Sequence, residues 1–220
     1  MDVYKNFILQ KNKIYILFLT LFSILINQYF GYIGILPIDS FLIFNSGYDF
    51  LNGILPFKDV WTIKEPFIDL LQALFFKIFG VSWFSYVFHA SFFNFLISLS
   101  TYFTLKYFNL NSELCLFYSI CVAILTYPTA GTPFSDHHTL ILIIISLYLF
   151  FIALKSNNNF IWFFIPILLG FAFLSKQTPT AYVALLIGSF SLIFFITKKR
   201  YKSLFVSLSG LFFFLTLFFI

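Results

Sequence analysis

The chain has 220 residues, of which 61% are hydrophobic and only 10% are charged, and it contains 37 Phe and 13 Tyr. This composition excludes a water-soluble globular domain and indicates a polytopic, all-α membrane protein. The formal net charge of +5 says less about partners than the side of the membrane on which each cation lies.

The first apolar run covers residues 14–36 and is long enough to cross a bilayer. It lacks the small-residue cleavage site of a secretory signal peptide, so we expect a retained anchor. The next ionisable residue is Asp39, in the stretch "LPIDSF". Asp39 can cap the helix that follows, which contributes about 1 kcal/mol, or it can act as a general base at the outer mouth of a helix bundle. Both interpretations stay open, and one residue can serve both.

The one long connection, residues 37–81, predicts an external loop that contains two amphipathic helices. In the first helix, four large side chains share one side and three polar ones share another: Phe41, Phe44, Tyr48 and Leu51 against Asn45, Asp49 and Asn52. The second helix follows Pro66 and stops at Gly80. Its polar residues oppose apolar ones: Glu65, Asp69 and Gln72 against Leu70, Leu71, Leu74, Phe75 and Ile78. Both helices are expected to lie flat in the outer membrane interface.

Further apolar runs predict six more spans, at 82–106, 113–130, 138–154, 159–175, 179–197 and 203–220. With a cytoplasmic N-terminus, nine cations fall inside and four outside, which satisfies the positive-inside rule. Those inside are Lys5, Lys11, Lys13, Lys106, Lys155, Lys198, Lys199, Arg200 and Lys202, and those outside are Lys58, Lys64, Lys77 and Lys176. Six of the eight acids fall outside, namely Asp39, Asp49, Asp59, Glu65, Asp69 and Asp136. Chemistry that needs carboxylates is therefore expected on the outer face.

Besides Asp39 and a histidine, three charged external residues are candidates for substrate contacts. Lys64, in "WTIKEPF", can bind a lipid phosphate, although a snorkelling lysine or a partner for Glu65 is the commoner role for such a residue. Asp136, in "GTPFSDHHTL", either caps the next helix or supplies a second carboxylate that faces the first or pairs with Lys64. Lys176, in "LSKQTPT", is a loop anchor or a second phosphate contact.

The histidines and cysteines do not form a metal-ligand pattern. His137 and His138 point about 100° apart on a helix, whereas a two-His metal face needs i, i+4 spacing; His137 remains a candidate substrate contact. His89 is interpreted as a hydrogen-bonded residue between helices. Cys115 and Cys121 point about 240° apart and are interpreted as buried free thiols. We predict no metal, no cofactor and no nucleic-acid partner.

The order of these residues resembles the C-type (GT-C) integral-membrane glycosyltransferases, closest to the protein O-mannosyltransferase and aminoarabinose-transferase-like group. The resemblance spans about residues 36–180: an acid after the first span, then "GILPFKDVWTIKEPFIDLLQALFFKIFG", an acid after the third span, and "GFAFLSKQTP". It implies that Asp39 is the catalytic acid, that Lys64 lies near the carrier phosphate, and that Asp136 is the second external acid. Ser40 and Glu65 depart from the family pattern, which often has two adjacent acids and a Lys-Pro-Pro sequence at these places.

The resemblance implies transfer of a hexose or pentose from a polyprenyl-phosphate donor to a lipid, glycan or protein acceptor, with inversion, at the outer face of the cytoplasmic membrane. A transporter or flippase is the first alternative, but it favours ionisable residues in the middle of spans rather than at their ends. A non-catalytic membrane scaffold is the second. Because the last run, "GLFFFLTLFFI", has no polar residue after it, we expect residues 1–220 to be the N-terminal module of a longer transferase.

Overall fold

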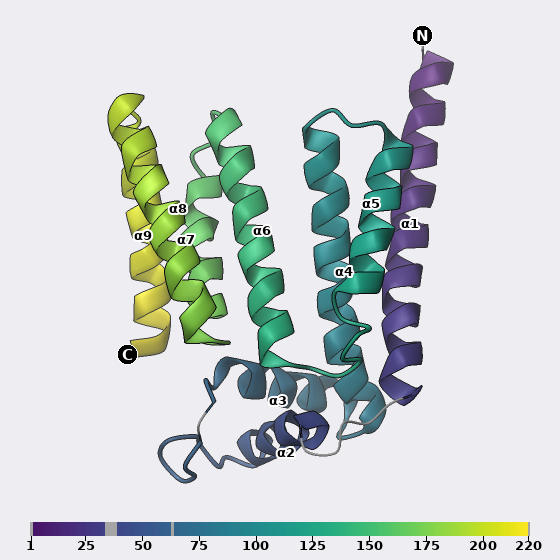
Figure 1. The fold of residues 1–220 in the computed structure, drawn as a ribbon, viewed down its shortest axis with the longest axis vertical. Coiled ribbons are helices and arrows are strands. Elements are labelled where there is room, and N and C mark those ends of the chain that lie inside the picture. The colour runs from purple at the N-terminus through teal and green to yellow at the C-terminus, as the bar shows by residue number, and fades with distance from the viewer. Residues whose placement is uncertain (1, 34–38, 63, 220) are drawn as a thin grey trace. The chain divides into compact units, whose positions relative to one another are not determined.

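The computed structural model describes residues 2–33, 39–62 and 64–219, with side chains described for 11–33, 41–62 and 64–217 (Figure 1). In this part of the chain the regular structure is helical, apart from an isolated bridge between Pro56 and Val60. The helices are α1 (Asp2–Ile33), α2 (Asp39–Leu51), α3 (Phe67–Phe79), α4 (Trp83–Tyr107), α5 (Ser112–Leu125), α6 (Ser135–Lys155), α7 (Ile161–Phe173), α8 (Gln177–Thr197) and α9 (Tyr201–Phe219). The predicted all-α class is confirmed.

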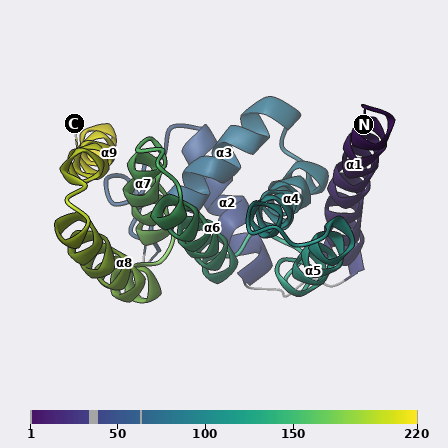
Figure 2. The same cartoon turned by 90° about the horizontal axis from the view of Figure 1, so that it is seen from above.

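The chain divides into two compact units. The first contains Met1–Ile54 and Asp69–Phe134, and the second contains Leu55–Ile68 and Ser135–Ile220. In the first unit α1, α4 and α5 run side by side, as Figure 2 shows from above. In the second unit α7 packs against α6, α8 and α9.

The polar residues of α4 hold the first unit together. The Asn94 side-chain amide donates to the carbonyl oxygens of Ser23 and Ala123, at 3.0 and 2.9 Å, and so joins α4 to α1 and α5. The Asn27 amide donates to the Ser91 hydroxyl at 3.0 Å. Hydrogen bonds between helices each contribute about 0.6 kcal/mol in membrane proteins, and they satisfy groups that lipid cannot. Helix α4 is therefore polar on the sides that face its neighbours.

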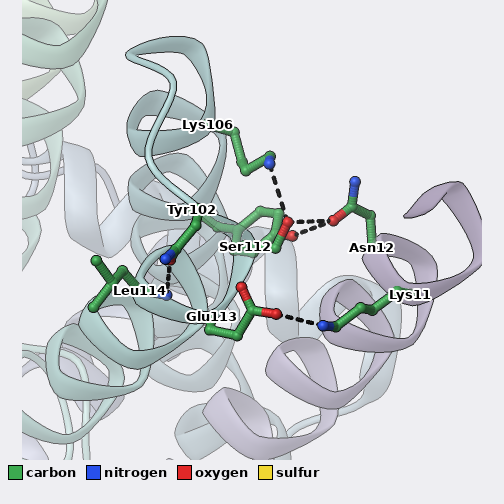
Figure 3. A network of polar contacts seen from close by, with 8 residues as sticks. Lys11, Asn12, Tyr102, Lys106, Ser112, Glu113 and Leu114 are labelled. Carbon is green, nitrogen blue, oxygen red and sulfur yellow. Dashed lines mark hydrogen bonds and ion pairs between the residues drawn. The ribbon is translucent and has the colours of Figure 1, made fainter. Parts of the chain in front are cut away.

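A second network ties the same three helices near the first turns of α5. Asn12 of α1 accepts hydrogen bonds from the hydroxyls of Ser112 and Tyr102, at 2.8 and 3.2 Å. Figure 3 shows these contacts beside the ion pair of Lys11 and Glu113. The α1, α4 and α5 helices are thus joined by polar side chains at this end as well as in the middle.

Helices α2 and α3 lie across the direction of α4 rather than along it (Figure 1). They approach closely at Gly47, where an added Cβ would meet Gln72 Cγ at 2.6 Å. The Ser46 hydroxyl donates to Asp69 Oδ1 at 2.6 Å, and Gln72 Oε1 is 2.8 Å from His89 Nδ1. The polar side of α3 therefore faces protein. Its apolar side is exposed, with Leu70 38%, Leu74 49% and Ile78 62% accessible.

Close packing of α7 and α9 organises the second unit. A Cβ added at Gly210 of α9 would meet the Phe163 carbonyl oxygen of α7 at 2.1 Å, and one at Gly170 would meet the Phe214 ring at 2.6 Å. Both glycines thus permit an approach that any side chain would prevent. On the other side of α7, Trp162 is buried against Phe195 of α8, with ring centroids 4.6 Å apart.

Each of the predicted spans coincides with a helix, but not all of these helices are long and apolar enough to cross a membrane. In the described part of the chain, Lys11–Ile33, Ser135–Lys155 and Gln177–Thr197 are long and apolar enough, whereas the apolar helices Ser112–Leu125, Ile161–Phe173 and Tyr201–Leu217 are shorter. The predicted end of one span at residue 130 is wrong: α5 ends at Leu125, because Pro128 disfavours helical geometry at the residue before it.

Candidate functional site

Two of the predicted substrate-binding residues lie together at one end of the second unit. Asp136 is in the first turn of α6, and Lys176 is the residue that precedes α8. The Lys176 ammonium donates to Asp136 Oδ1 in an ion pair whose side chains are 44% and 52% exposed. The partner of Asp136 is thus Lys176, whereas one interpretation of the sequence paired it with Lys64. An anionic ligand must compete with this carboxylate for the Lys176 ammonium.

Glu65 supplies the cap of α8, a role that the sequence did not reveal. Lys176 occupies the N-cap position with extended backbone, φ −163° and ψ 121°, and its side chain makes no capping bond. Instead, Glu65 Oε1 accepts from the Gln177 backbone N–H at 3.2 Å. A carboxylate at this place satisfies a free helix N–H and interacts favourably with the positive end of the helix dipole. The acid that departs from the family's Lys-Pro-Pro sequence thus has a structural purpose here.

The segment that carries Lys64 is fastened to the end of α7. The Phe67 N–H donates to the Leu174 carbonyl oxygen at 3.3 Å, and the Phe67 ring stacks on Phe171 with centroids 4.7 Å apart. The Lys64 N–H donates to the Thr62 hydroxyl at 3.2 Å. Together with the Glu65 cap, these contacts place the Lys64 backbone at the same end of the unit as Asp136 and Lys176.

The stretch "GILPFKD" forms a closed turn before this segment. Gly53 has φ +84° and ends α2, a conformation that suits glycine. The Asp59 carboxylate accepts from the Leu55 N–H at 2.9 Å, and the Phe57 N–H donates to the Val60 carbonyl oxygen at 2.9 Å. Trp61 follows with 83% of its surface exposed. An exposed indole beside this turn is typical of a residue at a membrane interface, and the sequence reasoning had not singled it out.

Asp39, the predicted catalytic acid, begins α2, but its side chain lies outside the described residues. Both of its proposed roles, helix cap and general base, therefore remain predictions.

The histidines occupy different environments. His137 is partly buried and follows Asp136, whereas His138 is fully buried. This difference fits the angle of about 100° between consecutive helical residues. His89 is hydrogen-bonded to Gln72 and stacks on Phe75 with centroids 4.6 Å apart, which confirms its predicted place between helices. In the part of the chain that the structure describes, no three His, Cys, Asp or Glu side chains gather as metal ligands would.

Tyr127 closes the connection that follows α5. Its hydroxyl accepts from the Phe134 N–H at 3.1 Å. Burial raises the pKa of Tyr127 well above its usual range, so the hydroxyl stays protonated at neutral pH. This buried side chain thus helps to hold residues 127–134 in a closed loop, together with the Asn27 amide, which donates to the Gly131 carbonyl oxygen at 3.3 Å.

Helices that can cross a membrane, with a charged cluster at the ends of α6 and α8, define a multi-pass membrane protein whose polar candidate site lies at helix ends. Residues 64–220, more than half of the chain, match the family described as dolichyl-phosphate-mannose-protein mannosyltransferase. The chain belongs to this family of membrane glycosyltransferases, which confirms the resemblance to the C-type enzymes. Separate comparisons with curated proteins and with solved structures find no match. The matched residues include Lys64, Asp136 and Lys176, while Asp39 precedes them.

Proposed function

We propose that the protein transfers a hexose or pentose from a polyprenyl-phosphate donor to an acceptor hydroxyl at the external face of the membrane, with inversion. The observation that carries this proposal is the meeting of Lys64, Glu65, Asp136 and Lys176 at one end of the second unit, within the residues that match the family. A phosphate-linked donor needs cations, and an acceptor hydroxyl needs carboxylates or imidazoles as hydrogen-bond partners. This cluster offers both kinds of group.

The proposed topology places the protein in the cytoplasmic membrane, with its N-terminus in the cytoplasm. It has seven spans, α1 and α4 to α9. Helices α2 and α3 lie in the external interface. The exposed apolar side of α3, with Leu74 49% and Ile78 62% accessible, supports this placement, because such a side is stable only against lipid or another protein. In the second unit α6 carries Asp136 in its first turn and Lys155 in its last, as the positive-inside rule requires for this orientation.

In the proposed ground state the lipid phosphate binds Lys64 and replaces the Asp136 carboxylate at Lys176. The exchange is feasible because a partly exposed ion pair contributes only about 0–1 kcal/mol, while a phosphate offers more acceptor oxygens and more charge. Asp136 and the neighbouring His137 are then available to position the acceptor. The ion pair in the described structure is, in this scheme, the resting arrangement of the site.

In the proposed chemical step, an acceptor oxygen attacks the anomeric carbon while Asp39 takes its proton. The bond between the anomeric carbon and the phosphate oxygen breaks, and the polyprenyl phosphate leaves with the electron pair. Lys64 stabilises the charge that develops on the leaving phosphate. General-base assistance of this kind contributes roughly 10² to 10⁴ in rate.

The donor side of this proposal can be tested without knowing the acceptor. Thermal stability of the purified protein is measured with a polyprenyl phosphate and with the matching polyprenol, which has the same chain and no phosphate. We expect the phosphate to give the larger stabilisation, and Lys64→Gln to reduce the difference between the two lipids. Lys77→Gln removes an exposed lysine of α3 and serves as the matched control. Equal effects of phosphate and alcohol on the unmodified protein would contradict the proposal.

A further inference from the structure

A long apolar groove runs between α8 and α9, with α7 as its floor. The cavity has a volume of about 710 Å³, and its lining side chains are apolar except for Ser191 and Ser207. Gly188 of α8 lines it without contributing a side chain, and a Cβ added there would meet nothing within 4 Å. Gly210, in contrast, lets α9 press against α7. Helix α9 is therefore held on α7, and a space remains beside α8.

At the end of this groove, a turn of unusual composition joins α8 to α9. The Arg200 N–H donates to the Phe195 carbonyl oxygen at 2.8 Å, and the Lys199 N–H donates to that of Ile196 at 3.2 Å. These two bonds form the Schellman motif, in which the residue at the position of Lys199 adopts left-handed geometry and is usually glycine. Lys199 has φ +53°. The chain thus accepts a backbone strain that glycine would avoid, and keeps a cation at this position.

Arg200 makes this turn rigid. Its guanidinium donates to the Ser156 carbonyl oxygen at 2.9 Å and to Asn159 Oδ1 at 3.2 Å, and the Ser203 hydroxyl donates to the same oxygen at 2.6 Å. The turn between α6 and α7 is thereby fastened to the turn between α8 and α9. The Arg200 guanidinium is thus hydrogen-bonded within the protein, whereas the neighbouring lysines are exposed.

Three exposed lysines, Lys198, Lys199 and Lys202, form what we call the lysine turn. The acids of the second unit lie elsewhere in the sequence, at Asp59 and Glu65 before α3 and in the first turn of α6. In the described part of this unit, no ion pair involves the lysine turn. Three like charges on five consecutive residues repel one another, and an external anion removes that repulsion.

The groove and the lysine turn adjoin. Phe195, which lines the groove, precedes Lys198 by three residues, and Leu204, which also lines it, follows Lys202 by two. At a rise of 1.5 Å per helical residue, the lysines lie within about 5 Å of the end of the groove along the helix axis. Tyr201, 52% exposed, stands at the same level, as aromatic residues do at a membrane interface.

We propose that this site binds one anionic phospholipid, with an acyl chain in the groove and the phosphate at the lysine turn. The uncharged lining of the groove requires a hydrocarbon occupant, while the adjoining lysines require an anion, and an anionic phospholipid is the amphiphile that satisfies both. Lys176 precedes α8 and the lysine turn follows it, so the two sets of cations lie at opposite ends of this helix. The groove itself extends as far as Phe173 and Ala181. Binding of the phosphate at the lysine turn does not depend on glycosyl transfer.

Thermal stability and native mass spectrometry test this site on the purified full chain after delipidation. Phosphatidylglycerol and phosphatidylcholine with identical acyl chains are added in turn. We expect phosphatidylglycerol to raise the melting temperature more and to be retained at one molecule per chain. The double variant Lys198→Gln/Lys202→Gln loses the preference for phosphatidylglycerol, whereas Lys58→Gln/Lys77→Gln, which removes equal charge from exposed lysines elsewhere, keeps it.

Two further variants separate lipid binding from folding. Lys199→Gly relieves the left-handed strain, so it raises the melting temperature of the delipidated protein while it lowers the rise given by phosphatidylglycerol. Gly188→Leu places a side chain in the groove, at a position where an added Cβ meets nothing within 4 Å, and reduces retention of the lipid. Equal retention of the two phospholipids by the unmodified protein, or an unchanged preference in Lys198→Gln/Lys202→Gln, would overturn the proposal.

Discussion

The contact between α7 and α9 gives a stability prediction that the structure makes quantitative. A Cβ at Gly210 lies 2.1 Å from the Phe163 carbonyl oxygen, and real Cβ contacts essentially never fall below 3.0 Å. In Gly210→Ala the two helices must therefore separate by roughly 0.9 Å, which loosens the packing along their whole contact. Overpacking of this kind costs about 1–3 kcal/mol, and the better helix propensity of alanine returns about 1 kcal/mol. We expect a net loss of about 0–2 kcal/mol in the free energy of unfolding.

Gly188→Ala is the matched control, since it is the same exchange in the neighbouring helix with nothing within 4 Å of the new Cβ. At Gly188 only the better helix propensity of alanine acts, so the free energy of unfolding of this variant should rise by up to about 1 kcal/mol. Denaturation in mixed micelles, followed by tryptophan fluorescence with Trp61 and Trp83 replaced by Phe so that the buried Trp162 alone emits, measures both variants. A Gly210→Ala protein as stable as Gly188→Ala would refute the described α7–α9 packing.

Three other predictions concern the ends of the helices. Glu65→Ala should cost about 1 kcal/mol and Glu65→Gln less, with faster hydrogen exchange in the first turn of α8 as the measurement; unchanged exchange would contradict the cap. A double-mutant cycle of Asp136→Asn and Lys176→Gln should give a coupling below about 1 kcal/mol in thermal stability, and a larger value would mean a stronger pair than its exposure implies. Tyr127→Phe removes the hydrogen bond that the Phe134 N–H donates to this hydroxyl and should cost about 0.5–1.5 kcal/mol at neutral pH. The pKa of Tyr127 is raised in the folded state, so the stability that its hydroxyl contributes is present below the usual tyrosine pKa of about 10. This stability declines as pH rises through the folded-state pKa. The alkaline unfolding curves of the unmodified protein and of Tyr127→Phe should therefore converge.

The sequence predicted the helices well because apolar runs and helix-breaking residues are local signals. Pro66 and Gly80 bracket α3 as expected, and Gly80 has φ +82°. The sequence could not show which side of α3 faces protein, since an amphipathic pattern defines two sides without naming their neighbours. Pro128 indicates that α5 ends before it, but the predicted span followed the apolar run to residue 130 instead.

The candidate site was predictable in its residue types and less so in its pairings. Asp136 and Lys176 were each identified from their position after or before an apolar span, but 40 residues separate them and no local pattern joins them. The contact between Glu65 and Gln177 spans 112 residues, and it depends on how the segment before α3 packs on the end of α7. Long-range hydrogen bonds of this kind follow from tertiary packing, which composition and periodicity do not encode.

Sugar transfer by Asp39→Asn shows whether Asp39 is the general base of a glycosyltransferase. Membranes that contain the protein are incubated with radiolabelled polyprenyl-phosphate sugar, and label in lipid, glycan and protein fractions is measured. Asp49→Asn, the same exchange in the same helix, is the control. We expect a loss of roughly 10² to 10⁴ in rate for Asp39→Asn and near-normal transfer for Asp49→Asn. Full transfer by Asp39→Asn would contradict the assignment of Asp39 as the general base.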